Sequence, residues 1–342
     1  MDYGVLVDPL LKPGDLIALA RQVEQAGFTH FWYPDEKFFR ECYVGLTLVA
    51  AHTSRIQLGP CVTDPYSRHP IMTAAAIGTL AEVAPGRVWL GLGAGGRGLK
   101  AMGITQDRPA RAIREAIEVI RGLLAGQSVN YEGEVIRLED RPLDFTPTES
   151  VRIMIGTGHG RYTQQLAGEV ADAAMVANYA SPDVLDRALV WVRKGAQRAG
   201  RSLDDLTLIS RVDVAVHADR ATARAAVAPK VLSALRSSYP ELAYLDVLPP
   251  FEMPSELVRV LGKKDYKTRA YYADPAHSAP LIPDVLIDHL AVAGTPAEVT
   301  ARLRAIGAMG FGQIAIRAVP AGDQTLQSCL DLVATDVLPG LN

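Results

Sequence analysis

The feature that most constrains the fold is a repeat of short apolar runs, each followed by a segment with helical periodicity. The eight apolar runs are residues 3–7, 28–33, 55–62, 87–93, 151–156, 171–177, 206–216 and 311–319. They are too apolar for strands with one face in water, so they predict a parallel sheet covered by helices. The most economical α/β arrangement is a (β/α)8 barrel, and the alternative is a doubly wound open sheet.

Two segments interrupt this repeat. Residues 127–145 contain strand-forming residues on both sides of a Glu-Gly pair, which predicts an inserted hairpin. Between residues 233 and 288, prolines break up short apolar pieces, which predicts a long excursion before the last strand. The excursion can serve either as a lid over a site or as a subunit interface. Since nothing resembles a linker, we expect one domain over residues 1–342.

Composition excludes several classes of partner. With 342 residues, 49% hydrophobic and 21% charged, the chain has the make-up of a globular protein. A formal net charge of -3 gives no reason to expect nucleic acid or an anionic membrane as a partner. The three cysteines are widely spaced and the histidines lack metal-ligand spacing, so we expect no disulfide framework, no metal and a cytoplasmic location.

Residues that follow the strands are the candidates for a site, because these loops share one end of a βα barrel. Carboxylates occur there in three places, at Asp8, at Asp35 and Glu36, and at Asp64. Any one of them is more often a helix cap or a solvated loop residue, but three together at strand ends indicate a site. The other residues past strand ends are 61–63, 94–99, 156–161, Asn178, Tyr179, 211–213 and Arg317.

Two glycine-rich stretches stand at strand ends. GLGAGGRG at residues 91–98 contains the spacing GxGxxG, but a Rossmann turn requires an acid about 20 residues further on, and that position lies inside a predicted helix. These glycines instead suggest a close approach of a flat ring or a phosphate tail. GTGHGR at residues 156–161 lies between a strand and a helix, where backbone N–H groups and Arg161 can bind phosphate. The alternative for this stretch is a tight turn.

Several motifs together resemble one known superfamily. They are LGPCVTDPYSRHP, GRVWLGLGAGGRGLKAMGI, IREAIEVIRGLLAGQSVNYEGEVI, LAGEVADAAMVAN and AGTPAEVTARLRAIGAMGFGQIAI. The chain is similar to the luciferase-like flavin- and F420-dependent oxidoreductases, and most of all to methylenetetrahydromethanopterin reductases. The resemblance implies a TIM barrel of the luciferase-like type, F420 or FMN as cofactor, and a homodimer.

The resemblance also implies roles for individual residues. A bulge with a non-prolyl cis peptide at Cys61–Val62 would lie against the back of the cofactor ring, Asp35 would contact the deazaflavin, and Asp35 and Glu36 are the catalytic candidates. Candidate cofactor-binding residues are Asp35, Cys61, Val62, Thr63, Asp64, Ala94, Gly95, Gly96, Gly156, Gly158, His159, Gly160 and Arg161.

The chain departs from the reductases at two acids. Leu6 and Gly96 stand where the reductases carry a glutamate and a second acid. The expected function is therefore hydride transfer between F420 or FMN and a small organic substrate that need not be that of the reductases. One alternative is an FMN-dependent monooxygenase served by a flavin reductase, and another is a non-catalytic cofactor-binding protein.

Overall fold

The computed structural model describes residues 1–96, 98–158, 160–242, 245–263 and 265–341. The chain forms two compact units. Residues 4–175 and 191–207 make the N-terminal unit, and residues 1–3, 176–190 and 208–342 make the C-terminal unit. Strands β1 (Asp2–Leu6) and β8 (Ala173–Ala177) each run from one unit into the other along the chain. The single domain predicted over residues 1–342 therefore stays a prediction.

Parallel strands in sequential order form the sheet of the N-terminal unit. Its other strands are β2 (His30–Tyr33), β3 (Gln57–Pro60), β4 (Trp89–Leu92) and β7 (Arg152–Thr157). Val5 is paired with Phe31, Phe31 with Leu58, and Leu90 with Ile153, while a bridge from Leu58 to Val88 joins β3 to β4. A doubly wound sheet reverses its strand order, whereas this order advances one strand at a time, as in a βα barrel.

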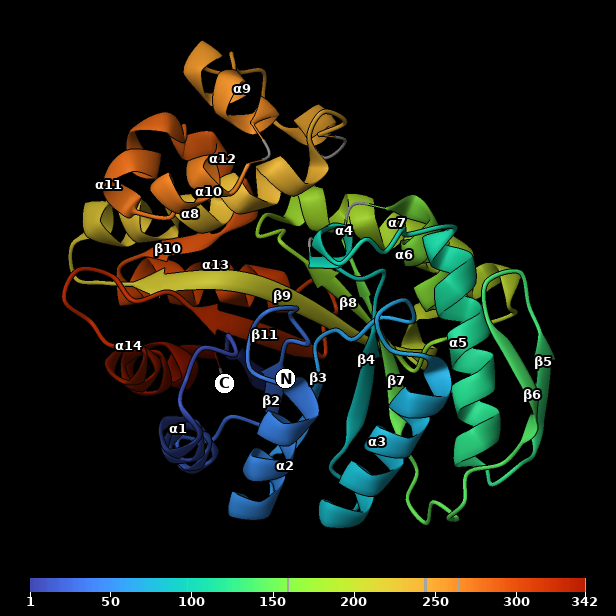
Figure 1. Cartoon of the computed structure of the whole chain (residues 1–342). Helices are drawn as coiled ribbons and strands as arrows, with labels where there is room; N and C mark the ends of the chain where they lie inside the picture. The colour runs from blue at the N-terminus through green and yellow to red at the C-terminus, as the bar shows by residue number, and fades with distance from the viewer. Residues whose placement is uncertain (97, 159, 243–244, 264, 342) are drawn as a thin grey trace. The chain divides into compact units, whose positions relative to one another are not determined.

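Helices of the N-terminal unit follow the predicted pattern. They are α1 (Pro13–Gln25), α2 (Cys42–His52), α3 (Pro70–Val83), α4 (Gly98–Ala101), α5 (Pro109–Leu124) and α6 (Arg161–Val170). In α5 the apolar residues recur at helical spacing, so Ile113, Ile117 and Ile120 are buried along one stripe. Figure 1 shows α3 and α5 side by side, and these two helices are in contact.

The inserted hairpin predicted over residues 127–145 is confirmed. Strands β5 (Val129–Glu132) and β6 (Arg137–Arg141) are antiparallel and lie along α5 (Figure 1). The buried Glu115 carboxylate of α5 accepts backbone N–H groups from Glu134 at 3.0 Å, Val135 at 2.9 Å and Ile136 at 2.8 Å. The turn of the hairpin is thus tied to a helix, which satisfies donors that would otherwise be unpaired.

Three parallel strands, β9 (Thr207–Val216), β10 (Val292–Gly294) and β11 (Gln313–Ala318), form the sheet of the C-terminal unit. β9 pairs with both β10 and β11. The sequence analysis did not predict β10, because a three-residue strand carries too little periodicity to be recognised. Helices α13 (Pro296–Gly307) and α14 (Leu326–Leu332) flank β11, and Thr295 caps α13 as the first residue of a capping box.

The excursion over residues 233–288 is helical. After α8 (Arg220–Ser238) come α9 (Ser255–Gly262), α10 (Tyr266–Tyr271), α11 (Pro275–Ser278) and α12 (Asp284–Leu290), and α11 and α12 lie along α8 (Figure 1). Pro254, Pro275 and Pro283 stand at the starts of α9, α11 and α12. These prolines begin short helices, since proline is accommodated in the first turn. No helix among the described residues is long and apolar enough to cross a membrane.

A carboxylate that accepts backbone N–H groups also anchors the start of β3. Glu24 of α1 accepts from Ser54 at 2.9 Å, Arg55 at 2.7 Å and Ile56 at 2.9 Å. Burial acts to raise the pKa of Glu24, but the hydrogen bonds from these N–H groups outweigh it and hold the pKa below its usual value of 4.5. The charged form is therefore favoured by folding.

We predict that Glu24→Gln lowers the free energy of unfolding by about 1 kcal/mol at pH 7. Because the folded pKa is the lower one, this contribution is present above about pH 4.5 and is lost as the pH falls through the folded pKa. Urea unfolding between pH 7 and 3 measures the difference between wild type and variant. Glu82→Gln, at an exposed site on α3, is the control. If the difference in the free energy of unfolding between wild type and Glu24→Gln does not decrease as the pH is lowered, the prediction is contradicted.

Candidate active site

The end of strand β3 carries the unusual backbone that the resemblance implies. The peptide bond between Cys61 and Val62 is cis, so this prediction is confirmed. Beyond it the chain pairs with β4 again, since Thr63 N–H donates to the Gly91 carbonyl and Gly93 N–H to the Thr63 carbonyl, both at 2.9 Å. Cys61 Sγ lies 3.4 Å from Met175 Sδ of β8. Cys61 is half-buried.

The Val62 side chain fills space that two glycines leave. A Cβ added to Gly93 would lie 2.4 Å from Val62 Cγ2, and one added to Gly156 would lie 2.5 Å from Val62 Cγ1. Real Cβ atoms do not approach so closely, so the two glycines on β4 and β7 are required for the position of Val62. Gly93 and Gly156 therefore have a packing role here. For Gly156 this role is additional to the predicted contact with the cofactor.

A lysine holds the loops after β2 and β3 together. Lys37 Nζ lies 2.8 Å from Asp64 Oδ2 and donates to the Asp35 carbonyl oxygen at 2.8 Å. Asp35 Oδ2 in turn accepts the Thr63 hydroxyl at 2.7 Å. Lys37 is 11% exposed and Asp64 only 1%, so water screens this ion pair little. The sequence analysis placed Asp35 and Asp64 in one site and missed Lys37, although two converging acids call for a cation.

The two aspartates have different environments. Burial acts to raise the pKa of Asp64, but hydrogen bonds from the Lys37 ammonium and the Ser67 backbone N–H outweigh it and lower the pKa. Asp64 also accepts the Tyr66 N–H at 2.9 Å and the Ser67 hydroxyl at 2.9 Å. Its carboxylate therefore organises the loop. The other oxygen of Asp35, Oδ1, takes no part in the hydrogen bond from Thr63. It lies 3.9 Å from Lys37 Nζ.

An arginine and a tyrosine complete this cluster. Arg68 Nε lies 3.9 Å from Asp35 Oδ2, its guanidinium forms a 2.7 Å ion pair with Glu41, and it stacks 4.7 Å from the Tyr43 ring centroid. Burial, and after it the acidic groups of Cys42 and Asp35, raise the pKa of Tyr43 far above its usual value. Tyr43 is itself buried, with 8% of its surface exposed. Neither Arg68 nor Tyr43 was among the predicted site residues.

The loop after β4 approaches the loop after β2. Gly95 has φ +81°, and a Cβ there would lie 2.5 Å from Leu99 Cδ1 and 3.1 Å from Asp64 Cγ. Gly96 is exposed, and a Cβ added to it would meet only Glu36 Oε2, at 3.9 Å. Gln106 donates from its side chain to the carbonyls of Ala94 and Gly95 and so closes this loop. The Glu36 carboxylate thus lies beside Gly96.

The loop from β7 to α6 has the form of an anion-binding turn. Helix α6 begins after Gly160, which has no side chain to cap the first turn, and Thr163 Oγ1 and Gln164 Nε2 donate to the carbonyls of Gly160 and Gly158. A Cβ added to Gly158 would meet nothing within 4 Å, so the loop is open on that side. Arg161 is exposed and stacks on the Tyr162 ring. His159, also a predicted site residue, lies outside the described residues.

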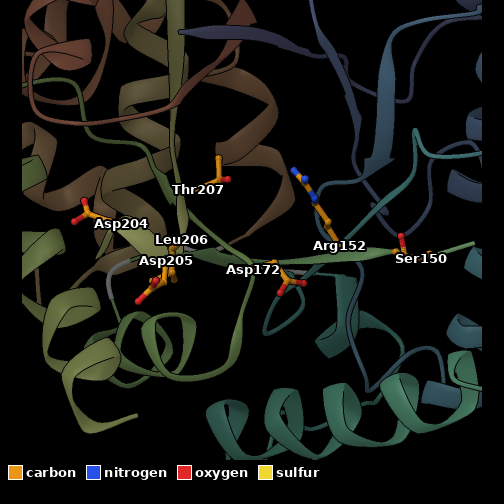
Figure 2. Close-up of a pocket in the computed structure, with 8 residues that line it drawn as sticks. Ser150, Arg152, Asp172, Asp204, Asp205, Leu206 and Thr207 are labelled. Atoms are coloured by element: carbon orange, nitrogen blue, oxygen red, sulfur yellow. The ribbon is translucent and has the colours of Figure 1, made fainter. Parts of the chain in front are cut away.

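A separate hollow of about 490 Å³ lies at the opposite ends of the strands. Figure 2 shows its lining residues, among them Arg152 at the start of β7, Asp172 just before β8 and Thr207 at the start of β9. Asp172 Oδ2 already accepts the Ile153 N–H at 2.7 Å. Conserved chemistry in βα barrels belongs to the carboxyl ends of the strands, so we assign no catalytic role to this hollow. No group of three metal-ligating side chains occurs in the described part of the chain.

The predicted site residues of the N-terminal unit therefore form one region. Asp35, Glu36, Thr63 and Asp64 come together at the ends of β2 and β3, and the loop of Ala94, Gly95 and Gly96 joins them from β4. The β7–α6 loop supplies Gly158, Gly160 and Arg161 from the next strand of the sheet. This arrangement can hold a flat ring against β3 and an anionic group at α6.

Comparison with known proteins shows the family to which the chain belongs. The family model described as "Luciferase-like monooxygenase" matches residues 4–313, and the chain belongs to this family of (β/α)8 barrels. The 5,10-methylenetetrahydromethanopterin reductase of Archaeoglobus fulgidus is 31% identical over 344 residues, which covers 100% of both chains. The F420-dependent hydroxymycolic acid dehydrogenase of Mycobacterium tuberculosis is 35% identical over 239 residues, 65% of this chain and 64% of its own.

A solved structure agrees with these relatives. The coenzyme F420-dependent tetrahydromethanopterin reductase of Methanopyrus kandleri superposes with a TM-score of 0.85 at 26% identity, covering 100% of this chain and 99% of its own. The prediction of a luciferase-like (β/α)8 barrel is confirmed, as is the resemblance to the reductases.

We predict that two neighbouring glycines tolerate alanine very differently. Gly95→Ala should lower the free energy of unfolding by about 1–3 kcal/mol, because its φ is left-handed and the new Cβ meets Leu99. Gly96→Ala should change it by less than about 0.5 kcal/mol, because the added Cβ makes an ordinary van der Waals contact, 3.9 Å from Glu36 Oε2. Urea unfolding of both variants measures this. Equal losses would show that the loop is not packed as described.

Proposed function

We propose that this protein is an F420-dependent oxidoreductase that transfers hydride between the deazaflavin and a small organic substrate. The observation that carries the proposal is the full-length similarity to an F420-dependent reductase structure, at a TM-score of 0.85, with a cis peptide at the predicted ring position. F420 is favoured over FMN because two of the relatives, the hydroxymycolic acid dehydrogenase of Mycobacterium tuberculosis and the reductase of Methanopyrus kandleri, are F420-dependent by name.

The residues present fit such a cofactor. Cys61 and Val62 would form the wall behind the ring, and Asp35 and Thr63 would face its polar edge. The uncapped start of α6 would bind the phosphate, since free N–H groups and the helix dipole favour an anion there. When bound, the cofactor supplies a carbon that accepts or donates hydride. The protein's task is to hold ring and substrate in contact and to exclude water.

Glu36 is the proposed proton carrier. Its carboxylate is exposed at the end of β2 and lies beside Gly96, where the reductases are expected to carry an acid. A carboxylate from a neighbouring loop can therefore reach the space that the missing side chain leaves. Leu6, at the end of β1, is buried and offers no proton-transfer group. We infer that the substrate differs from that of the reductases.

We also propose a homodimer through helices α2 and α3. The two helices are in contact, and their exposed residues are almost all uncharged. Val44 is 63% exposed, Met72 57% and Val83 43%. A helix that is apolar around its whole circumference is normally buried, so a second copy of the chain is the natural cover. The cytoplasmic location expected from the cysteines stays a prediction, which cell fractionation would test.

We predict that the purified protein binds F420, and that Asp35→Ala weakens binding at least tenfold, about 1.4 kcal/mol. Asp64→Asn should weaken it far less, because Asp64 is occupied by Lys37 and Ser67. Fluorescence titration with F420 and, in parallel, with FMN measures both affinities. Binding of FMN alone with oxygen-dependent turnover would support the monooxygenase instead. Binding of neither cofactor would exclude both enzymes, and equal losses in the two variants would refute the assignment of Asp35.

Glu36→Gln is the matched variant for the catalytic role. It should keep F420 affinity within about twofold, because Glu36 is exposed and outside the ring-binding residues. In hydride exchange between reduced F420 and a panel of alcohols, aldehydes and imines, the rate should fall about 100-fold. F420 binding without exchange in wild type would instead identify a cofactor-binding protein without this catalytic activity.

We predict that Val44→Glu and Met72→Glu convert the protein from dimer to monomer, because a buried charge in an apolar interface is costly. Light scattering after size-exclusion chromatography measures the mass. Val258→Glu, at a 38% exposed site on α9, should leave the dimer intact. A wild-type protein that is monomeric at micromolar concentration would refute this proposal.

A further inference from the structure

The loop after β2 contains a turn that its own contacts do not stabilise. The Glu36 carbonyl accepts the Phe39 N–H at 3.4 Å, which is long for a hydrogen bond, and this contact closes a turn over Lys37 and Phe38. Phe38 has φ +69°, a left-handed conformation that is unfavourable for a residue with a Cβ. The Phe38 side chain is 76% exposed, so packing does not hold the turn either. The turn therefore depends on an anchor outside its own backbone.

The Lys37 side chain is that anchor. Its ammonium donates to the Asp35 carbonyl at 2.8 Å and lies 2.8 Å from Asp64 Oδ2. Its stem packs against Gly98, where an added Cβ would lie only 2.4 Å from Lys37 Cβ. The side chain is 11% exposed. One lysine thus connects the loops that follow β2, β3 and β4, all within the N-terminal unit.

The carbonyl that Lys37 contacts determines where Glu36 points. The Asp35 carbonyl and the Glu36 N–H belong to the same planar peptide group, so a hydrogen bond to this oxygen fixes the orientation of that plane. The direction in which the Glu36 side chain leaves the backbone is fixed with it, and the carboxylate lies beside Gly96. The Asp35 carboxylate is oriented separately, by the Thr63 hydroxyl at 2.7 Å.

Stability alone does not account for a charged pair at this position. Two charges that are removed from water lose hydration that their attraction only partly restores, and an apolar pair of similar volume is often as stable. The pair does supply a hydrogen-bond donor at a fixed point. Asp64 is held by the backbone N–H groups of Tyr66 at 2.9 Å and Ser67 at 2.8 Å, and it sets the position of the Lys37 ammonium. The ammonium is in turn directed at the Asp35 carbonyl.

We propose that Lys37 is a positioning residue for the reaction, which holds the peptide between Asp35 and Glu36 so that the Glu36 carboxylate faces the reacting groups. Lys37 acts through Glu36 and transfers no proton itself. This inference rests on the proposed function, in which Glu36 carries the proton, and it adds the residue that makes Glu36 effective.

The test removes the ammonium and its partner carboxylate together. Lys37→Met alone leaves the Asp64 carboxylate buried without a cation, so this variant should unfold at a lower urea concentration than wild type. Lys37→Met/Asp64→Asn leaves neither charge unpaired and should regain most of that midpoint. Methionine also keeps an unbranched stem against Gly98. Rates of the double variant are compared with those of Asp64→Asn, which retains Lys37.

Relative to Asp64→Asn, the double variant should keep F420 affinity within about threefold, because Thr63 still orients Asp35, and should lose about 30-fold in the rate of hydride exchange. Glu36→Gln should cost about 100-fold in Asp64→Asn but only about threefold in the double variant, because both changes remove the same contribution. Lys267→Met, at an exposed site on α10, is the control and should alter neither quantity.

Three results overturn the proposal. The first is an unchanged exchange rate in the double variant. The second is multiplication of the two losses to about 3,000-fold, which shows that Lys37 and Glu36 act independently. The third is a loss of F420 affinity as large as the loss of rate, which shows that Lys37 acts on the cofactor.

A wild-type protein that neither binds F420 nor exchanges hydride is a failure of the proposed function, and the cofactor-free protein then tests Lys37 by itself. In hydrogen–deuterium exchange, the amides of residues 35–39 should exchange at least about tenfold faster in the double variant than in Asp64→Asn, because the turn has lost its anchor. The amides of α5 should exchange at the same rate in both, which verifies that the variant is folded. Equal exchange at residues 35–39 overturns the positioning role.

Discussion

Close contact between the end of β3 and its neighbouring strands determines the geometry of the candidate site. Val62 occupies the volume that side chains on Gly93 and Gly156 would otherwise fill, and Thr63 then resumes pairing with β4. Because interiors are packed as densely as crystals, no larger residue fits at either glycine. This packing fixes where Thr63 stands, and Thr63 in turn orients the Asp35 carboxylate. The proposed wall behind the cofactor is thus a consequence of strand packing.

The charged and polar partners of Asp35 and Asp64 differ, although the two acids look equivalent in the sequence. Asp64 is almost fully buried, paired with Lys37 and bonded to the backbone of its own loop. Asp35 receives the Thr63 hydroxyl and retains a carboxylate oxygen beyond that bond. A buried pair is strongly coupled, so Lys37 and Asp64 hold two loops together, whereas Asp35 and Glu36 are the groups that we propose to meet a ligand.

Particular elements show how far the sequence can be interpreted. The amphipathic pattern of α5 and the Glu-Gly turn of the hairpin are local signals, and both elements were predicted correctly. The strand β10 is too short for a periodicity, and the prolines of residues 233–288 were taken as breaks, although they begin helices. Arg68 and Tyr43 were missed because nothing near them in the sequence indicates their partners, whereas Lys37 was missed although it directly follows the predicted acids Asp35 and Glu36. Glycines in the sequence did not indicate which positions are tightly packed. Gly95 and Gly96 are adjacent, but only Gly95 has neighbours too close for a side chain.

The sequence by itself determined the alternation of strand and helix, and with it the parallel sheet, because burial of both sheet faces imposes an apolar pattern that is local and periodic. The motifs it carries also determined the family and the position of the cis peptide. Only the tertiary structure decided that Asp64 is neutralised by Lys37, that Glu36 stands beside Gly96, and that Arg211 and Arg317 share Asp213. These relations depend on distances between side chains on different strands, and such distances follow from packing and strand register, which no local pattern encodes.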